Sequence, residues 1–320
     1  MVKRCLYCYK ELSAGETDFH PGCSRKIFGK PVPPELPYTE EQMLELAQQV
    51  IKSHAAVTGV QPKLSLELEK PAGTDVPQRF TIVGLWGGYI LKPPTKQYAD
   101  LPEIEDLTMH LAAISCIETV PHSLIRLRSG NLAYITKRVD RKGKEKIHME
   151  DMCQLTERLT EHKYQGSYEQ IGKAIIKYSA DSGLDVVNFF EQVVFSFLTG
   201  NADMHLKNFS LIKAPETGYT LCPAYDMVAT ALVVEGDSEE LALNLNGKKR
   251  KLNRNDFHAA MSRFNIREKS IENIFSKFER SIPDWIDFVE ISFLPKAKKK
   301  EFIKLIQAKA LQLGLGQRDK

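Results

Sequence analysis

The stretch Gly200-Asn-Ala-Asp203-Met-His205-Leu-Lys-Asn208-Phe209 decides how this sequence of 320 residues is interpreted. An apolar segment, Val186 to Leu198, precedes it, and Pro223-Ala-Tyr225-Asp226 places a further Asp eighteen residues beyond Asn208. An Asp, an Asn five positions later and a second Asp form the arrangement that phosphoryl transfer requires. The apolar segment predicts a buried helix that presents the loop rigidly at its end.

Each of the three polar residues has a predicted role. Asp203 would accept the proton of an acceptor hydroxyl, whereas Asn208 and Asp226 would bind Mg2+, which prefers hard oxygen ligands. Taken singly, each residue is also explained by a turn or by a solvated or capping carboxylate. The joint spacing favours the catalytic interpretation.

A second signal is Thr58-Gly59-Val60-Gln61-Pro62-Lys63, which lies between a predicted helix and a predicted strand. Gly59 would let backbone amides approach phosphate groups closely. Neither G-x-G-x-x-G nor the Walker lysine pattern occurs, so a simple turn is the alternative. The position of the stretch just ahead of a strand favours a phosphate-binding loop.

Lys92 ends the predicted strand Tyr89-Ile-Leu-Lys92 some thirty residues later. Kinases place at such a position a lysine that binds the nucleotide phosphates and pairs with a helix glutamate. Glu103 and Glu105 open the next predicted helix and are the candidates for that partner. The alternatives are a lysine with a solvated tip and glutamates that favour the helix N-terminus.

The periodicity of apolar residues predicts an α+β protein with a small β-rich lobe followed by a larger helical lobe. Strands are expected over residues 63–69, 79–83, 89–92, 124–128 and 132–137, and helices over residues 40–54, with Thr39 as N-cap, and 101–117. From His148 onward the pattern is mainly helical, with a β-like interruption between Phe209 and Leu221. This order is one way to build a nucleotide site, although one architecture hosts many functions.

Four residues near the start, Cys5, Cys8, His20 and Cys23, have the spacing of a tetrahedral zinc site. A module of about thirty residues cannot fold on an apolar core alone, and thiolates and imidazole suit Zn2+. Free reduced cysteines are the alternative. A catalytic zinc is disfavoured, because four protein ligands leave no open position.

Four prolines between Pro31 and Pro37 predict a stiff break after this module. The expected domains are a zinc knuckle over residues 1–30, a proline-rich linker over 31–38, a small lobe over 39–140 and a helical lobe over 141–320. The small lobe would carry the glycine-containing loop, and the helical lobe the catalytic loop.

The composition excludes several classes of protein. The chain is 42% hydrophobic, and its 44 basic and 41 acidic residues give a net charge of +3, which indicates no nucleic-acid partner by itself. No apolar run reaches the roughly 20 residues that a bilayer requires. The start lacks a secretory pattern, so a cytoplasmic protein with reduced cysteines is expected.

Seven motifs together resemble those of the HipA-family serine/threonine kinases. They are Thr58 to Lys63, Ile90-Leu-Lys92-Pro-Pro94, Lys137-Arg-Val-Asp140-Arg141, His148-Met-Glu150-Asp151-Met-Cys-Gln154, Lys163-Tyr-Gln-Gly-Ser-Tyr168, Gly200 to Phe209 and Pro223 to Asp226. The resemblance covers roughly residues 50 to 310 and implies a two-lobed kinase-like fold that binds ATP and Mg2+.

The resemblance also implies which residues contact the nucleotide. Outside the glycine-containing loop they are Lys92, Gln154, His205 and Tyr225. Within the loop the predicted contacts are Thr58, Gly59, Val60, Gln61 and Lys63. The hinge, here Lys137 to Val139, would hold the adenine largely through backbone groups.

The activity implied by the resemblance is that of a toxin from a toxin–antitoxin system. Its acceptor would be a cytoplasmic protein such as a translation factor or an aminoacyl-tRNA synthetase. The expected partners are an antitoxin, through which alone DNA would be contacted, and a separate small protein resembling the N-terminal subdomain of HipA. The latter is expected because only about fifty residues precede the loop, fewer than in full-length family members.

The loop departs from the family in one respect. Family members autophosphorylate a serine there, whereas this chain reads Ala56-Val57-Thr58-Gly59, so Thr58 is the sole local candidate. Two other hypotheses stay open. A small-molecule kinase on the same scaffold would use identical metal and base residues, and an inactive kinase-like module would only recruit partners. The intact set of Asp203, Asn208, Asp226 and Lys92 makes the inactive module the less economical hypothesis.

Overall fold

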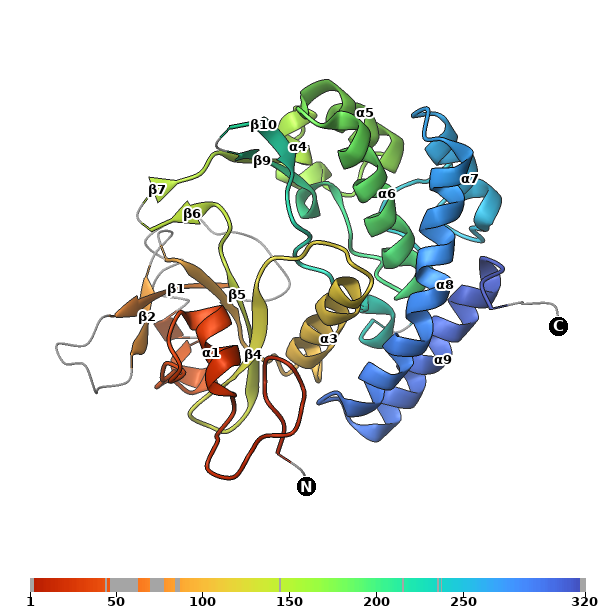
Figure 1. Cartoon of the computed structure of the whole chain (residues 1–320). Helices are drawn as coiled ribbons and strands as arrows, with labels where there is room; N and C mark the ends of the chain where they lie inside the picture. The colour runs from red at the N-terminus through yellow and green to blue at the C-terminus, as the bar shows by residue number, and fades with distance from the viewer. Residues whose placement is uncertain are drawn as a thin grey trace. The chain divides into compact units, whose positions relative to one another are not determined.

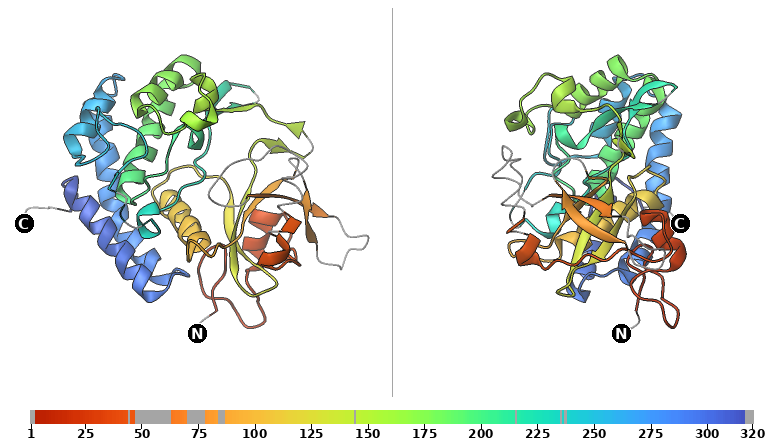
Figure 2. Two further views of the ribbon diagram at one scale, coloured as in Figure 1. Left: turned by 180° about the vertical axis from the view of Figure 1, so that it is seen from behind. Right: turned by 90° about the vertical axis from the view of Figure 1, so that its left-hand side faces the viewer.

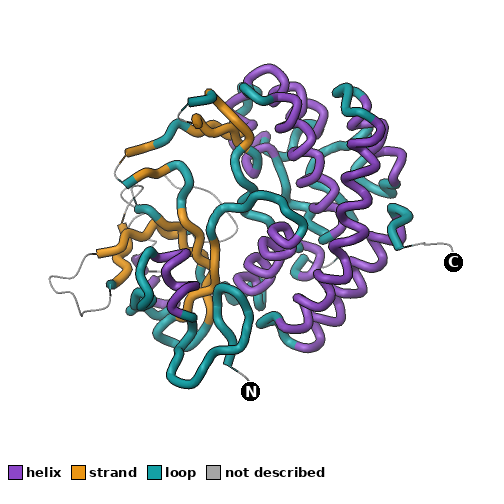
Figure 3. The backbone as a smooth tube through the Cα atoms, viewed as in Figure 1, coloured by secondary structure: helices purple, strands orange, loops and turns teal. Residues whose placement is uncertain are grey.

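The computed structural model describes residues 3–43, 45–46, 63–69, 78–83, 87–143, 145–214, 216–234, 236 and 238–316. The chain forms two compact units. Unit 1 comprises Met1–Asp106, Val120–Lys146 and Ile291–Phe293, and unit 2 comprises Leu107–Thr119, Ile147–Glu290 and Leu294–Lys320. Most strands belong to unit 1 and most helices to unit 2. Figure 3 draws the strands in orange and the helices in purple.

Unit 1 is built on a five-stranded antiparallel sheet in the order β2-β1-β3-β5-β4 (Figure 1). The strands are β1 (Leu64–Glu69), β2 (Arg79–Val83), β3 (Tyr89–Lys92), β4 (His122–Arg126) and β5 (Leu132–Lys137). Leu91 pairs with Leu64 on one side and with Ile135 on the other, and all three side chains are buried. The alternating apolar residues of these strands therefore face the buried side of the sheet.

The predicted strands of unit 1 are confirmed, with one shift, and one hairpin of this unit was not predicted. β4 begins and ends two residues before the expected range, because the turn starts at Leu127, which exchanges backbone hydrogen bonds with Gly130 and Asn131. The hairpin of β6 (Arg141–Lys142) and β7 (Glu145–Lys146) was not predicted, since strands of two residues have no readable periodicity.

The N-terminal segment of unit 1 packs on this sheet. Its helix α1 (Pro21–Phe28) was not predicted, although it starts with a proline and ends at Gly29, whose φ of 79° is left-handed. Phe28 meets the ring of Phe80 edge to face at 5.8 Å. The Tyr89 hydroxyl donates to the Ile27 carbonyl at 3.0 Å. Figure 2 shows α1 beside the strands in both views.

The helix expected after the linker begins at Glu40. Thr39 caps it as predicted, since its hydroxyl accepts from the Gln42 N–H at 3.4 Å and its own N–H donates to the Gln42 side chain at 3.0 Å. The expected residues 47–54 of this helix lie outside the described part of the chain. The next helix, α3 (Leu101–Ile114), begins in unit 1 and ends in unit 2.

Unit 2 is mainly helical, as expected. Its helices are α4 (Met152–Leu155), α5 (Tyr168–Tyr178), α6 (Ser182–Leu198), α7 (Arg254–Ser262), α8 (Glu268–Ile291) and α9 (Lys296–Gln312), with 3-10 turns η1 (Thr160–His162), η2 (Leu206–Asn208) and η3 (Thr230–Leu232). The predicted β interruption forms β9 (Ser210–Ala214) and β10 (Gly218–Leu221). They join β8 (Met149–Asp151), a strand that was not predicted, in a three-stranded sheet of the order β10-β9-β8. Among the helices described, none combines the length and hydrophobicity needed to span a bilayer.

Candidate active site

The buried helix α6 leads directly into the stretch that carries Asp203. Phe195, Phe197 and Leu198 near its end have no exposed surface, and the helix packs against α5 and α9. Gly200 then turns the chain with a left-handed φ of 66°. A β-carbon at this position would lie 2.7 Å from the Leu305 side chain and 2.9 Å from the Ala231 β-carbon, which together with the left-handed backbone favours glycine. The predicted rigid support of the loop is thus present.

Asp203 and Asn208 belong to one hydrogen-bonded turn. The Asp203 N–H donates to the Asn201 side-chain oxygen at 3.1 Å, and the Asn208 amide nitrogen donates to the Asp203 carbonyl at 3.0 Å. The Ala202 N–H donates to the Thr230 hydroxyl at 2.9 Å. Because the amide nitrogen of Asn208 is used within the turn, its carboxamide oxygen is the atom suited to bind a hard cation.

Asp226 follows a tyrosine that ties its segment to the same turn. The Tyr225 hydroxyl donates to the Lys207 carbonyl at 2.9 Å and lies 2.6 Å from the Ser210 hydroxyl. Asp226 has a left-handed φ of 60°, a conformation that is uncommon for non-glycine residues and is tolerated best by Asn and Asp. The hydroxyl of Tyr225 is used within unit 2, so the predicted contact with nucleotide is left to its ring.

Tyr164 contacts the candidate base directly, which the sequence analysis did not predict. Its hydroxyl donates to Asp203 Oδ1 at 2.5 Å, and its ring meets the His205 ring edge to face at 4.9 Å. Burial and the Asp203 carboxylate raise the pKa of Tyr164 well above its usual value. Tyr164 belongs to the motif Lys163-Tyr-Gln-Gly-Ser-Tyr168, but no sequence pattern indicates a contact across 39 residues.

His205, a predicted nucleotide contact, is buried beside Asp203. Burial lowers the pKa of His205 to about 4, although the nearby Asp203 charge acts in the opposite direction. The imidazole is therefore neutral at physiological pH. Its Nδ1 accepts from the Lys207 N–H at 3.3 Å, which leaves Nε2 as the protonated donor of the ring.

Gln154, another predicted nucleotide contact, forms the capping box of α4. Its side-chain oxygen accepts from the Asp151 N–H at 2.9 Å, and Asp151 accepts from the Gln154 N–H at 3.0 Å. The second Asp151 oxygen binds the Lys207 ammonium at 2.7 Å. Gln154 is exposed, so its amide nitrogen can donate to a ligand while its oxygen fixes the side chain.

In unit 1, Lys92 pairs with Glu105 and not with Glu103. The ammonium lies 2.5 Å from a Glu105 oxygen, and the two residues are 4% and 0% exposed. The Lys92 ammonium also lies 5.4 Å from the centre of the Tyr134 ring. Glu103 has a different environment, because burial raises its pKa to about 7. One of the two glutamates proposed from the sequence is thus the partner of the strand lysine.

The remaining predicted nucleotide contacts of unit 1 stay predictions. Lys63 is exposed immediately before β1, whereas Thr58 to Gln61 lie outside the described residues. The Lys137 N–H donates to the Pro121 carbonyl at 2.8 Å, and the Arg138 N–H to the Gly88 carbonyl at 2.9 Å. A hinge contact with adenine would therefore use other backbone groups of Lys137 to Val139.

Cys5, Cys8, His20 and Cys23 converge in unit 1, with ligand atoms that all lie within 4.8 Å of one another. His20 Nδ1 lies 3.5 Å from Cys8 Sγ and 3.8 Å from Cys23 Sγ. Sulfur and nitrogen ligands of a tetrahedral zinc lie roughly 3.5 Å apart, so the spacing fits Zn2+. Burial and the neighbouring thiols raise the pKa of Cys23 to about 12, a crowding that a divalent cation would relieve.

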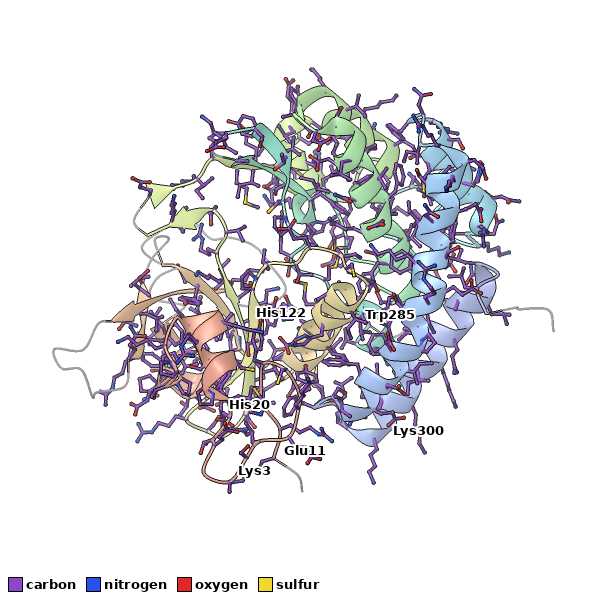
Figure 4. The ribbon with its side chains drawn as sticks, in the orientation of Figure 1. Lys3, Glu11, His20, His122, Trp285 and Lys300 are labelled. Atoms are coloured by element: carbon purple, nitrogen blue, oxygen red, sulfur yellow. The ribbon has the colours of Figure 1, made fainter. Side chains whose placement is uncertain are left out.

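The second ring nitrogen of His20 supports the same interpretation. Nε2 lies 3.0 Å from the Glu11 carbonyl, so it carries the proton and leaves Nδ1 as a metal ligand. Figure 4 labels both residues in the N-terminal segment. The four residues fit a closed structural site without an open position for catalysis.

The fold and these residues define an α+β kinase-like protein, as predicted. The family described as the HipA-like C-terminal domain matches residues 55–286, so the chain belongs to this family. The resemblance deduced from the seven motifs is thereby confirmed.

Relatives found by sequence carry kinase names. A Sinorhizobium fredii (strain NBRC 101917 / NGR234) protein named "Putative kinase Y4dM" is 33% identical over 236 residues, 69% of this chain and 55% of the relative. A Haemophilus influenzae protein named "Putative kinase" is 27% identical over 210 residues, 62% of this chain and 59% of the relative. The chain thus spans little more than half the length of these two relatives.

Two solved structures share the fold. The Shewanella oneidensis MR-1 toxin–antitoxin system of HipA, HipB and its operator DNA matches 94% of this chain and 80% of its own chain, with 18% identity and a TM-score of 0.67. The Helicobacter pylori proinflammatory kinase CtkA matches 70% of this chain and 87% of its own, with 14% identity and a TM-score of 0.52. At these identities the matches show the fold alone.

Proposed function

We propose that the chain is an ATP- and Mg2+-dependent protein kinase that phosphorylates serine or threonine. The buried ion pair of Lys92 and Glu105 carries the proposal. Burying two charges costs free energy, so a buried ion pair contributes little net stability to the fold. A functional role explains this pair better than a structural one. In kinases the lysine of this pair binds the nucleotide phosphates, and the glutamate holds the lysine in place. Asp203, Asn208 and Asp226 in unit 2 support the same chemistry.

Each proposed residue has a distinct task. Asp203 accepts the proton of the acceptor hydroxyl, Asn208 and Asp226 bind Mg2+ through oxygen atoms, and Lys92 binds phosphate oxygens while Glu105 fixes its ammonium. MgATP supplies the phosphoryl group together with a cation that offsets its charge. Further nucleotide contacts come from Gln154, His205, Tyr225, the backbone of Lys137 to Val139, and the loop of Thr58 to Lys63.

The proposed biological role is that of a toxin in a toxin–antitoxin system. The fold similarity to a HipA crystallised with HipB and its operator DNA supports this role. An antitoxin would bind this chain and contact DNA. The acceptor would be a cytoplasmic protein such as a translation factor or an aminoacyl-tRNA synthetase.

The decisive experiment is transfer of radiolabelled phosphate from ATP in a cell lysate. The intact chain should label a discrete protein on serine or threonine with Mg2+ present, and Asp203→Ala should bind MgATP without transferring phosphate. Asp226→Ala should lose Mg2+-dependent ATP binding, and normal binding by this variant would contradict its assignment to the metal.

Two results would replace the proposal. Label on small molecules with none on protein would identify a small-molecule kinase. A chain that transfers nothing, and whose effect on cell growth persists in Asp203→Ala, would be an inactive kinase-like module.

We also propose that Cys5, Cys8, His20 and Cys23 bind one structural Zn2+. The convergence of the four ligand atoms and the Glu11 bond to His20 support this site. Elemental analysis of the purified chain should find about one zinc, and replacing Cys5 and Cys8 with serine should release it. A chain that retains zinc after both replacements would contradict this ligand set.

A further inference from the structure

The proposed zinc cluster fixes the tyrosine that follows one of its ligands. Tyr9 is next to Cys8, has a left-handed φ of 61° and has no exposed surface. Its N–H donates to the Cys5 carbonyl at 2.9 Å, and its carbonyl accepts from the Arg4 side chain at 3.1 Å. The turn that positions the two cysteines therefore also positions the Tyr9 side chain.

The side chain of Tyr9 reaches α3. Its hydroxyl donates to Asp106 Oδ2 at 2.8 Å, and its ring packs edge to face on Phe293 at 4.8 Å. The other Asp106 oxygen lies 2.7 Å from Nδ1 of His122, a β4 residue labelled in Figure 4. Asp106 has no exposed surface, so this carboxylate depends on its protein partners.

Asp106 directly follows Glu105, the partner of Lys92. Successive residues of a helix project about 100° apart. The helix α3 therefore presents Glu105 to β3 and Asp106 to Tyr9 and His122. The two sets of contacts are compatible with one rotation of α3 about its axis. A rotation that broke the contacts of Asp106 would also disturb the pair of Glu105 and Lys92.

The N-terminal segment is fixed to the sheet as well as to α3. The Leu6 carbonyl accepts from the Leu124 N–H at 3.3 Å and from the Ser123 hydroxyl at 3.1 Å. The Arg126 guanidinium binds Asp18 at 2.8 Å. The cluster thus connects α3 with β4, the edge strand of the same sheet that carries Lys92.

We propose that metal bound by the cluster of Cys5, Cys8, His20 and Cys23 orients α3, so that Tyr9 and Asp106 are positioning residues for the Lys92–Glu105 pair. The metal is Zn2+, and its occupancy controls how tightly unit 1 binds the phosphates of MgATP. This inference rests on the proposed kinase function, because it assigns a task to Lys92.

The test compares two buried tyrosines. Tyr9→Phe keeps the ring and the zinc ligands but removes the hydrogen bond to Asp106. Tyr89→Phe removes a similar hydroxyl, which donates to the Ile27 carbonyl at 3.0 Å and joins α1 to the sheet. We expect Tyr9→Phe to weaken MgATP binding about tenfold and to leave kcat at saturating ATP unchanged, because a hydrogen bond to a charged group is of that size. Tyr89→Phe should stay within about twofold.

A double-variant cycle separates positioning from a general loss of stability. In a Glu105→Gln chain the pair with Lys92 is already weakened, so adding Tyr9→Phe should change MgATP affinity little. Equal losses in both backgrounds, or equal effects of Tyr9→Phe and Tyr89→Phe, would overturn the inference. Zinc content should remain about one per chain in Tyr9→Phe, which excludes loss of metal as the cause.

Metal removal gives the second measurement. The full chain stripped of zinc should bind MgATP about tenfold more weakly or worse, and added Zn2+ should restore binding. A zinc-free chain with normal MgATP affinity would overturn the inference but leave the proposed kinase unaffected. Failure of the zinc-loaded chain to bind MgATP would overturn both.

Discussion

The hydroxyl of Tyr164 donates a hydrogen bond to Oδ1 of Asp203, the carboxylate proposed as the base. Tyr164 is 43% exposed, and its ring lies edge-on to the neutral His205. The bond at 2.5 Å restricts rotation of the Asp203 carboxylate and leaves Oδ2 for the hydroxyl of an acceptor. Tyr164 would therefore orient the base without taking part in proton transfer.

Tyr164→Phe should lower kcat for phosphoryl transfer about tenfold, because the charged carboxylate loses a hydrogen bond while the ring contact with His205 is kept. MgATP affinity should change less than twofold. Steady-state kinetics at several ATP concentrations would measure both values. Tyr178→Phe is the control, since Tyr178 is similarly exposed, at 39%, at the end of α5. An unchanged kcat in Tyr164→Phe would remove it from the site.

The sequence alone does not show which side chains contact each other. Glu103 and Glu105 both open α3, and only the rotation of the folded helix shows that Glu105 contacts Lys92. The site of Asp203, Asn208 and Asp226 could be predicted from residue spacing, because catalytic loops are short and local in sequence. The contact between Tyr164 and Asp203 was not readable, because it arises from tertiary packing.

Among the elements, α3 carries a glutamate in an unfavourable environment. Burial raises the pKa of Glu103 from its ordinary value of 4.5 to about 7, so the folded chain binds this proton more tightly than the unfolded chain. The stabilisation is fully present below about pH 4.5 and is lost as pH rises through about 7.

Glu103→Gln removes this charge and should raise the free energy of unfolding by about 1–3 kcal/mol at pH 8, with little change at pH 5. Urea denaturation at the two pH values would measure the difference. Glu118→Gln, at an exposed position, is the control and should behave alike at both. An equal effect of Glu103→Gln at pH 5 and pH 8 would contradict the role of ionisation.

Two helical glycines offer a test of packing in unit 2. A β-carbon on Gly172 of α5 would lie 2.6 Å from the Phe264 ring, whereas one on Gly183 of α6 meets no atom within 4 Å. Gly172→Ala should lower the free energy of unfolding by about 1–3 kcal/mol through overpacking. Gly183→Ala should raise it by up to about 1 kcal/mol through helix propensity. Urea denaturation of both variants checks the opposite signs.

The elements were predictable where apolar periodicity is long. The strands of the five-stranded sheet and the helix α6 follow from alternation and from a continuous apolar segment. The helix α1 was not predicted, because eight residues give little periodicity. The segment that contains it also depends for its fold on the Cys and His positions as much as on apolar residues.

For the whole molecule, several short motifs were enough to predict the family and the fold, because each motif carries a chemical requirement that constrains its spacing. The family model covers residues 55–286, which contain both Lys92 and Asp226. These two residues belong to different units, and apolar periodicity describes each unit only by itself. The proposed roles of Lys92 and Asp226 are therefore tested by one variant in each unit.

MgATP should raise the melting temperature of the intact chain by about 5 °C at a concentration one hundred times its Kd, since such binding contributes about 2.7 kcal/mol. Lys92→Met and Asp226→Asn should each reduce the shift strongly, because each removes one proposed contact with the phosphates or the metal. Differential scanning fluorimetry with ATP and EDTA as the metal-free control measures these shifts. A full shift in either variant would show that nucleotide binds without the residue concerned.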